Sequence, residues 1–312
     1  MSLSYPKRIF LTALVMLFGL LMIMAALWLP PVDREVDVMD SLFVIDITDS
    51  MNVQDVSFAN EKINRLDWAK EYTRQAILSM PCGSHAGLAI FSEARSLILM
   101  TPVEVCANYH DLMQMLSQFQ PTMAWARSSE VSKALYTAIR QAKEITPQPT
   151  VVFLTDGHEA PPVHETLFPK FTDTPGEVPG IIIGIGGSDL MPIPKTNESG
   201  EIDGYWEINE AMHRDVYASS RGDAAELNEN RPRTEHLSSQ KKSHMETVAK
   251  RIGFEFISSP KSPQNLIKEM QKISEMRQQP VKYDLFVWLA SIALVLLLLV
   301  FLPYSLFSKQ HD

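Results

Sequence analysis

Residues 41–51 read Ser-Leu-Phe-Val-Ile-Asp-Ile-Thr-Asp-Ser-Met, and this stretch decides the fold class. Its first half is a short apolar run ending at Asp46, which is typical of a strand buried on both faces of a parallel sheet. In open α/β sheets, ligands bind just beyond the carboxyl ends of the strands. Asp46, Thr48 and Ser50 alternate along the chain, so in an extended turn their side chains can point the same way. One carboxylate and two hydroxyls form a hard oxygen set that suits Mg²⁺, Ca²⁺ or Mn²⁺ and does not suit zinc.

A second apolar run, Thr150-Val-Val-Phe-Leu-Thr155, is followed directly by Asp156 and Gly157. This run is predicted to be another buried strand, which places the Asp156 carboxylate at the same edge of the sheet as Asp46. Each motif alone has an ordinary structural explanation, either as a helix cap or as a common turn. The presence of both at strand ends in one chain favours a shared cation site.

Short apolar runs alternate with amphipathic stretches through the middle of the chain. Two of the runs, 87–91 and 96–103, are separated by only a few residues, so they are predicted to form an antiparallel hairpin. The alternation predicts an α/β fold in which a doubly wound, mostly parallel sheet carries helices on both faces. A single domain is expected over residues 41–276. Helices are predicted at 65–80, 109–119, 130–145, 243–252 and 263–276, and a further buried strand at 180–186.

An insertion at about residues 188–240 interrupts this alternation. It is rich in Pro, Gly, Asn, Ser and charged residues, and Tyr205-Trp206 is its main apolar feature. A loop of this length is either a functional surface insertion or a flexible segment, and the composition fits both.

The overall composition limits the class of protein. The chain has 312 residues, of which 46% are hydrophobic, and its mean hydropathy is −0.04. These averages exclude a disordered or collagen-like chain. The net charge of −9 and the pI of about 5.4 argue against binding to nucleic acid, which requires a basic face.

Two stretches, 9–29 and 285–302, carry no charged side chain. Each is long enough for a helix that crosses about 30 Å of hydrocarbon, so both are predicted to be transmembrane helices. The first could instead be a cleaved signal peptide, but its apolar run is too long, and Trp28-Leu-Pro-Pro31 follows it in place of a small-residue cleavage site. The second could be a buried core helix, but Trp288 and Tyr304 near its ends are typical of membrane interfaces.

The charges that flank the first stretch predict its orientation. Residues 1–8 contain Lys7 and Arg8 and no acid, so the positive-inside rule places the N-terminus in the cytoplasm. The second span returns the tail, 303–312, to the same side. The acidic domain between the spans is therefore expected to face the periplasm of a bacterium, anchored in the inner membrane by two passes. The first span is followed mostly by acids, namely Asp33, Glu35, Asp37 and Asp40 against Arg34.

The two cysteines flank the predicted hairpin. Cys82 precedes its first strand and Cys106 follows its second, so both lie at the same end. In an oxidising periplasm they are expected to form a disulfide. The alternative, two buried free thiols, fits less well because both have neighbours typical of turns, such as Pro81 and Gly83.

The motif Asp46-x-Thr48-x-Ser50, followed later by Thr155-Asp156-Gly157, resembles the von Willebrand factor type A domain over about residues 41–275. In that family the metal-ion-dependent adhesion site combines Asp-x-Ser/Thr-x-Ser with a middle-loop Thr and a later Asp. Ser129 occupies the middle-loop position here, with Ser128 as the alternative. The resemblance therefore implies that a cation is held by Asp46, Thr48, Ser50, Ser129 and Asp156.

A site of this kind leaves a coordination position that a carboxylate of a partner protein fills. The resemblance thus implies metal-bridged protein recognition and no catalysis. Asp49 is a further acid beside the motif, which either raises cation affinity or faces water. His158 and Glu159 follow Asp156 and are expected to be solvated more often than to line the site.

A narrower resemblance is to membrane-anchored members of the family that are encoded beside MoxR-type AAA+ ATPases. Within that group the chain is similar to the MxaL group of methanol-dehydrogenase accessory proteins. The similarity implies a role in maturing a periplasmic enzyme, such as a quinoprotein dehydrogenase, by delivering or checking a bound metal ion. The segments that carry this likeness are 44–53, 78–84, 101–106, 123–125, 156–162, 192–195 and 204–206.

Three other functions remain open at this point. A metal-dependent hydrolase of the cell envelope would use His158 or Glu159 as its base. An envelope protein of the aerotolerance or stress type would use the same domain for a different partner. A structural anchor would pair its second span with partner helices through Ala290-Ser291-x-Ala293.

Overall fold

The central sheet has six strands in the order β13–β8–β7–β2–β5–β6. The computed structural model describes residues 5–163, 168–211, 232–260 and 262–301. The strands are β2 (Asp40–Asp46), β5 (His85–Ser92), β6 (Arg95–Glu104), β7 (Thr150–Thr155), β8 (Gly180–Gly184) and β13 (Glu255–Ser258). All neighbours pair in parallel except β5 and β6, which form the antiparallel hairpin predicted from their spacing.

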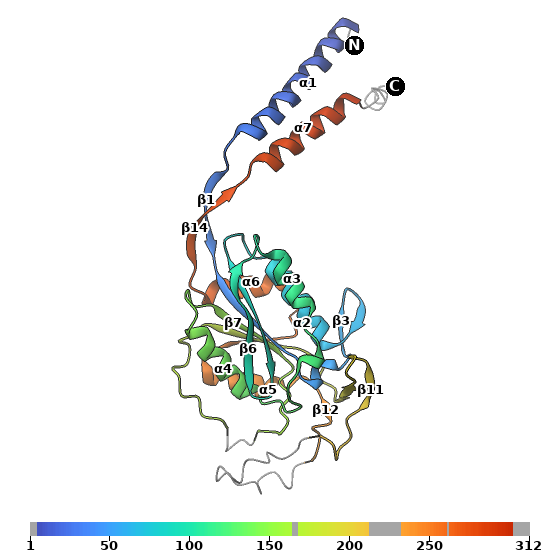
Figure 1. Cartoon of the computed structure of the whole chain (residues 1–312), viewed down its shortest axis with the longest axis vertical. Coiled ribbons are helices and arrows are strands. Elements are labelled where there is room, and N and C mark those ends of the chain that lie inside the picture. Colours follow the sequence, from blue (N-terminus) through green and yellow to red (C-terminus); the bar gives the residue numbers. More distant parts are fainter. Residues whose placement is uncertain (1–4, 164–167, 212–231, 261, 302–312) are drawn as a thin grey trace, which may run out of the picture. The chain divides into compact units, whose positions relative to one another are not determined.

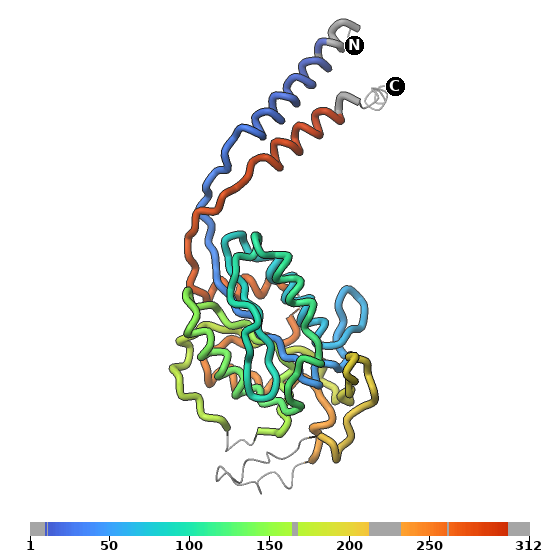
Figure 2. The backbone as a smooth tube through the Cα atoms, in the orientation of Figure 1, coloured from blue at the N-terminus to red at the C-terminus, as the bar shows by residue number. Residues whose placement is uncertain are grey.

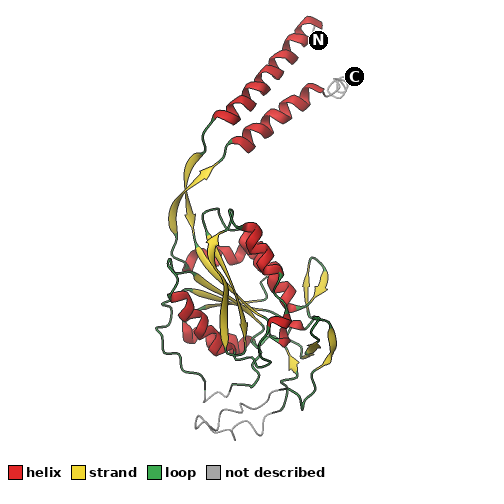
Figure 3. Ribbon diagram, in the orientation of Figure 1, coloured by secondary structure: helices red, strands yellow, loops and turns green. Residues whose placement is uncertain are grey.

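Two layers of helices cover this sheet (Figure 3). Phe43 and Ile45 of β2 belong to the core on one face, whereas Leu42 and Val44 belong to the core on the other, because side chains alternate along a strand. The first face packs against α2 (Arg65–Leu78), α3 (Tyr109–Ser117) and α6 (Pro263–Ile273), and the second against α4 (Val131–Lys143) and α5 (Lys242–Ile252). The predicted α/β fold is confirmed, and the helix bounds agree to within a few residues.

The insertion has secondary structure of its own. Its described parts contain β9 (Met191–Pro192), β10 (Pro194–Thr196), β11 (Ile202–Tyr205) and β12 (Leu237–Ser238). β10 pairs with β11 and β9 pairs with β12, so the segment before residue 212 and the segment after 231 are joined by a sheet. The part of the predicted insertion between them lies outside the described residues. The short elements η1 (Asp49–Asn52), β3 (Val56–Phe58), β4 (Glu61–Ile63) and η2 (Pro121–Met123) complete the domain.

The chain divides into two compact units, residues 37–277 and a second made from 1–36 with 278–312. In the first unit, the chain enters and leaves at the amino ends of the strands. Asp40 begins β2 and bonds both His85 Nδ1, at 2.7 Å, and Arg277 Nη2, at 2.5 Å. Asp46 ends the same strand, so the predicted site lies at the other end of the sheet.

The second unit contains α1 (Tyr5–Trp28) and α7 (Phe286–Phe301), with the strands β1 (Val32–Val38) and β14 (Arg277–Tyr283) paired beside them. The two helices lie side by side, as Figure 2 shows, and Leu297 packs close to Gly19. Within the described residues, no helix has the combination of length and apolar character needed to cross a membrane. The two predicted transmembrane helices, 9–29 and 285–302, are thus not confirmed. The predicted tails fall partly or wholly outside the described residues, at 1–4 and 303–312.

Candidate functional site

Asp46 organises the loop that follows β2. Its Oδ1 accepts hydrogen bonds from the Thr48 backbone N–H, at 2.9 Å, and from Thr48 Oγ1, at 2.7 Å. Its Oδ2 accepts a bond of 2.6 Å from Thr155 Oγ1 at the end of β7. The Thr48 and Ser50 hydroxyl oxygens are 3.3 Å apart. The carboxylate thus fixes the alternating side chains on one side of the turn, as the sequence predicts.

Asp156 lies beside Asp46 in the core of the same edge, and neither residue has any exposed surface. Burial and repulsion from Asp156 raise the pKa of Asp46 to about 7. Burial also opposes ionisation of Asp156, but the charge of Arg65 holds its pKa below the usual value. The structure therefore brings the two predicted acids together, and without a divalent cation one of them keeps its proton near neutral pH.

Arg65 is the main residue that sequence reasoning missed. Its guanidinium is fully buried and donates from Nη1 to Asp156 Oδ2, at 2.5 Å, and from Nη2 to Asp55 Oδ2, at 2.6 Å. Burial opposes its charge, but these two carboxylates raise the pKa of Arg65 above its usual value. An Arg that opens a helix normally faces water, so its position in the sequence carries no signal for this role. Gly186 leaves room for the Arg65 guanidinium, because a Cβ at this position would lie 2.7 Å from Arg65 Nε.

Ser129 lines the same cavity as Thr48 and Ser50, whereas Ser128 is not among its lining residues. Ser129 is buried and its backbone exchanges two 2.8 Å hydrogen bonds with Ala160, which follows the Asp156 loop. Its hydroxyl donates to the His158 carbonyl at 2.7 Å. Since Ser128 is absent from the lining of the site, the structure favours the first of the two alternatives.

A cavity of about 140 Å³ lies over these hydroxyls. Thr48, Ser50 and Ser129 all line it, although they come from two loops separated by about 80 residues of sequence. Asp46 and Asp156 do not line it and lie in the buried layer instead. The site thus combines three hydroxyl oxygens with two buried carboxylates below them, and the pKa of one carboxylate, Asp46, is raised. This set of oxygen donors fits a hard divalent cation.

Asp49 also lines this cavity. Burial raises the pKa of Asp49, while Arg127 acts in the opposite direction. The Arg127 guanidinium lies 4.7 Å from the ring centre of Trp206. The Asp49 side of the cavity is therefore bounded by the insertion.

His158 and Glu159 are buried, which corrects the expectation that they are solvated. His158 is 4% exposed and lines the cavity, and within the described residues neither of its ring nitrogens has a hydrogen-bond partner. Burial lowers the pKa of His158 to about 4, so the ring is neutral at pH 7. Glu159 instead accepts the first backbone N–H groups of α4, from Val131 at 3.1 Å and Ser132 at 3.2 Å.

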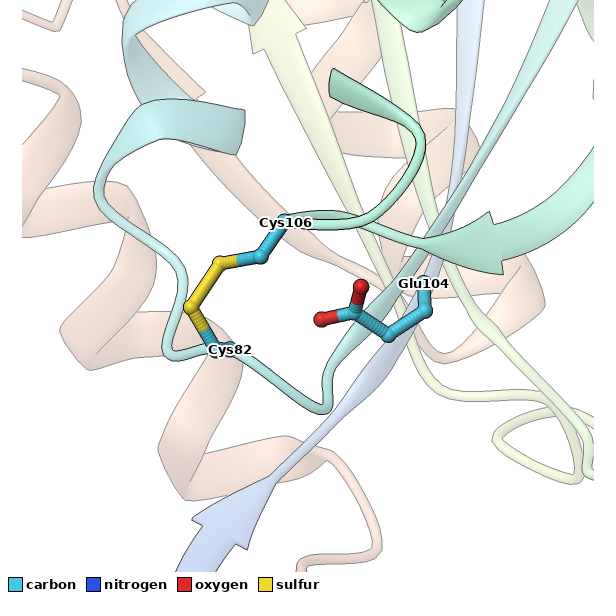
Figure 4. A group of neighbouring side chains, drawn as sticks. All are labelled: Cys82, Glu104 and Cys106. Atoms are coloured by element: carbon cyan, nitrogen blue, oxygen red, sulfur yellow. A yellow bond between two sulfur atoms is a disulfide. The ribbon is translucent and has the colours of Figure 1, made fainter. Parts of the chain in front are cut away.

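The predicted disulfide is present. Cys82 and Cys106 are joined across a sequence separation of 24 residues, with their Cα atoms 5.3 Å apart. Figure 4 shows Glu104 beside them, and its carboxylate accepts N–H bonds from Gly83 and Ala107. In the described part of the chain, these three side chains are the one His/Cys/Asp/Glu group close enough to hold a metal, but a disulfide offers no thiolate.

Comparison with known proteins supports the domain assignment. Residues 41–158 match the sequence model of the von Willebrand factor type A domain. An aerotolerance-related membrane protein from Bacteroides fragilis NCTC 9343 superposes with a TM-score of 0.51 at 18% identity, covering 75% of this chain and 98% of that one. The conserved hypothetical protein BatB from Bacteroides thetaiotaomicron gives a TM-score of 0.51 at 17% identity with the same coverage. No curated protein matches this chain.

Proposed function

We propose that the von Willebrand factor type A domain of this chain binds a partner protein through a divalent cation. The hydroxyls of Thr48, Ser50 and Ser129 would hold Mg²⁺, Ca²⁺ or Mn²⁺, and the buried Asp46 and Asp156 would balance its charge. The observation that carries the proposal is that these three hydroxyls line one cavity above two buried acids. When bound, the cation supplies an electrophilic centre for a carboxylate of the partner.

The test is capture of partners by the tagged full chain, with and without a chelator. We expect wild type to retain a partner that chelator releases, and Asp46→Ala to lose both the partner and cation binding in calorimetry. Glu269→Ala is the matched control, because Glu269 is an exposed acid on α6 that pairs with Lys272. Normal cation binding by Asp46→Ala would reject the proposed site.

We further propose that the partner belongs to the cell envelope. Two apolar stretches without charge, 9–29 and 285–302, support attachment of the chain to the inner membrane with the domain in the periplasm. The similarity of segments such as 156–162 to the methanol-dehydrogenase accessory group supports maturation of a quinoprotein dehydrogenase alongside a MoxR-type AAA+ ATPase. The fold shared with an aerotolerance-related membrane protein and with BatB supports an aerotolerance-type role instead. Identification of the partner that chelator releases distinguishes the maturation role from the aerotolerance-type role.

A cation-dependent hydrolase is the second candidate, favoured by the neutral ring of His158 at the cavity. Such a ring can accept a proton during attack by water. Turnover of a generic phosphate ester that His158→Gln abolishes would support this candidate. We expect no turnover, because a pKa near 4 makes His158 a weak base.

A further inference from the structure

The insertion contributes part of the lining of the cavity over the Asp46–Ser50 motif. Ile193, Trp206, Glu210 and Glu235 line the cavity together with the motif hydroxyls. Trp206 bonds back to Ile193 by an N–H···O bond of 3.0 Å, and Ile193 bonds to His236 at 3.1 Å. The described parts of the insertion, 188–211 and 232–240, therefore reach the cavity as one connected piece, which we call the covering segment.

Two sets of contacts fix the covering segment to the domain. The Trp206 ring centre lies 4.7 Å from Arg127 Cζ, outside the segment, and 5.0 Å from Lys195 Nζ, within it. Ser238 Oγ donates to Asp156 Oδ2 at 2.7 Å and accepts from Arg65 Nη1 at 2.7 Å. The segment is thus anchored both above the cavity and to the buried acid beneath it.

Glu210 and Glu235 both place an acid at the cavity, but their surroundings differ. Glu210 is paired with Lys195 at 2.5 Å, accepts the Glu207 N–H, and has a side chain that is 42% exposed. Glu235 is 9% exposed. Lys241 attracts the charge of Glu235, and burial lowers the pKa of Lys241.

Glu235 and His158 line both this cavity and a neighbouring one of about 380 Å³. A divalent cation above the motif hydroxyls would take Glu235 as a hard oxygen ligand from the same chain.

We propose that Glu235 is an internal ligand of the cation, occupying the position that a partner carboxylate would take, so that the covering segment keeps the site closed to partners. This inference rests on the proposed function and specifies its regulation. A partner must then displace Glu235 and release Trp206 from Arg127. The partner that can do so presents its own carboxylate together with an apolar surface.

The experiment titrates MnCl₂, MgCl₂ and CaCl₂ into the full chain by calorimetry, for wild type, Glu235→Gln and Glu210→Gln. Both variants remove one charge from the same cavity, but only the first removes the proposed ligand. We expect cation affinity to fall at least about tenfold in Glu235→Gln and less than about twofold in Glu210→Gln. Hydrogen exchange of residues 188–211 gives an independent readout. Cation should slow it in wild type and leave it unchanged in Glu235→Gln.

The controls separate this inference from the proposed function. Asp46→Asn should abolish cation binding, and unchanged binding there would reject the cation site itself. If Asp46→Asn loses the cation while Glu235→Gln binds as wild type does, Glu235 serves only to balance Lys241 and the internal ligand is rejected. Glu235→Asp, one methylene shorter, replaces Glu235→Gln if the latter does not fold, and the same loss of affinity is expected.

Discussion

At the scale of single residues, the Asp46 carboxyl group affects stability and, in the proposed function, also balances the charge of the cation. Its folded pKa of about 7 lies above the unfolded value of 3.8, so the folded state holds a proton that the unfolded state loses between those pH values. Without cation, Asp46 therefore reduces the free energy of unfolding as pH rises from about 4 to about 7. His158 acts in the opposite direction over the same range, because its folded pKa of about 4 lies below the unfolded value of 6.5.

The comparison of wild type with Asp46→Asn isolates the Asp46 contribution from that of His158. In chelator, we expect the variant to gain stability relative to wild type by roughly 2–3 kcal/mol between pH 5 and pH 8. Saturating Mg²⁺ or Ca²⁺ should abolish this gain, because the cation stabilises the ionised carboxylate. Urea unfolding at the two pH values measures this gain. A difference in stability between variant and wild type that does not change with pH would contradict the raised pKa of Asp46.

Arg65 is the second residue with a large predicted effect. Arg65→Met would leave the carboxylates of Asp55 and Asp156 buried without the guanidinium that pairs with them. We therefore expect a loss of about 3–5 kcal/mol in the free energy of unfolding. Arg74→Met is the control, because its pair with Glu71 lies near the surface and is worth at most about 1 kcal/mol. Urea denaturation followed by circular dichroism measures both. Equal losses would mean that the buried ion pairs add nothing beyond a surface pair.

The residues that the sequence predicts are those with a local pattern. Thr48 and Ser50 follow Asp46 at fixed spacing, so their convergence follows from strand geometry alone. Arg65 and Glu235 acquire their positions only when distant segments meet, and neither has a distinguishing neighbour in the chain. His158 lies two residues after Asp156, but its burial depends on distant segments. The motif can therefore be predicted from the sequence, whereas the residues that surround it in the folded chain cannot.

At the scale of elements, the buried strands were the easiest to predict. β2, β7 and β8 are continuous apolar runs because helices cover both of their faces. β13 was missed, since it has four residues and its outer side chains are half exposed or exposed at the edge of the sheet. The β3–β4 hairpin was also missed, because its turn uses Ala59 and Asn60 at positive φ in place of the usual Asn-Gly.

The disulfide holds the β5–β6 hairpin to the loop that follows α2. Replacing Cys82 and Cys106 by Ser should lower the free energy of unfolding by about 3 kcal/mol, because a closed loop of this length restricts the unfolded chain. Chemical unfolding of the variant and of wild type measures the loss. Intact mass with and without reductant checks the bond, and two free thiols in the unreduced protein would refute it.

The amino end of α4 depends on Glu159, which lies in a different loop. Glu159→Ala would leave the Val131 and Ser132 N–H groups without their acceptor, so we expect a loss of about 1–3 kcal/mol in the free energy of unfolding. Thermal unfolding gives the loss, and hydrogen exchange should speed up first at residues 131–134. Unchanged exchange there would show that water replaces the carboxylate.

At the scale of the whole molecule, the division into two units follows the composition. Residues 37–277 contain the alternating apolar runs, whereas 1–36 and 278–312 contain the two uncharged stretches. The short strands β1 and β14 were not predicted, because polar residues occupy most of their positions and leave no apolar face.

Membrane attachment is testable at this scale. We expect the full chain to remain in the membrane fraction after carbonate extraction and to require detergent for release, because 9–29 and 285–302 are uncharged. Residues 37–277 expressed without them should be recovered in the supernatant. Release of the full chain by carbonate alone would refute integral attachment.

The bond between Asp40 and Arg277 joins the beginning and the end of the larger unit, 37–277, at the end of the sheet away from Ser50. This proximity makes the unit suited to transplantation. Residues 37–277 can be grafted into a surface turn of another protein, or their ends joined by a short linker for circular permutation. Either rearrangement leaves the loops that carry Asp46, Ser129 and Asp156 unchanged, so the proposed cation site should be transferred intact with the unit.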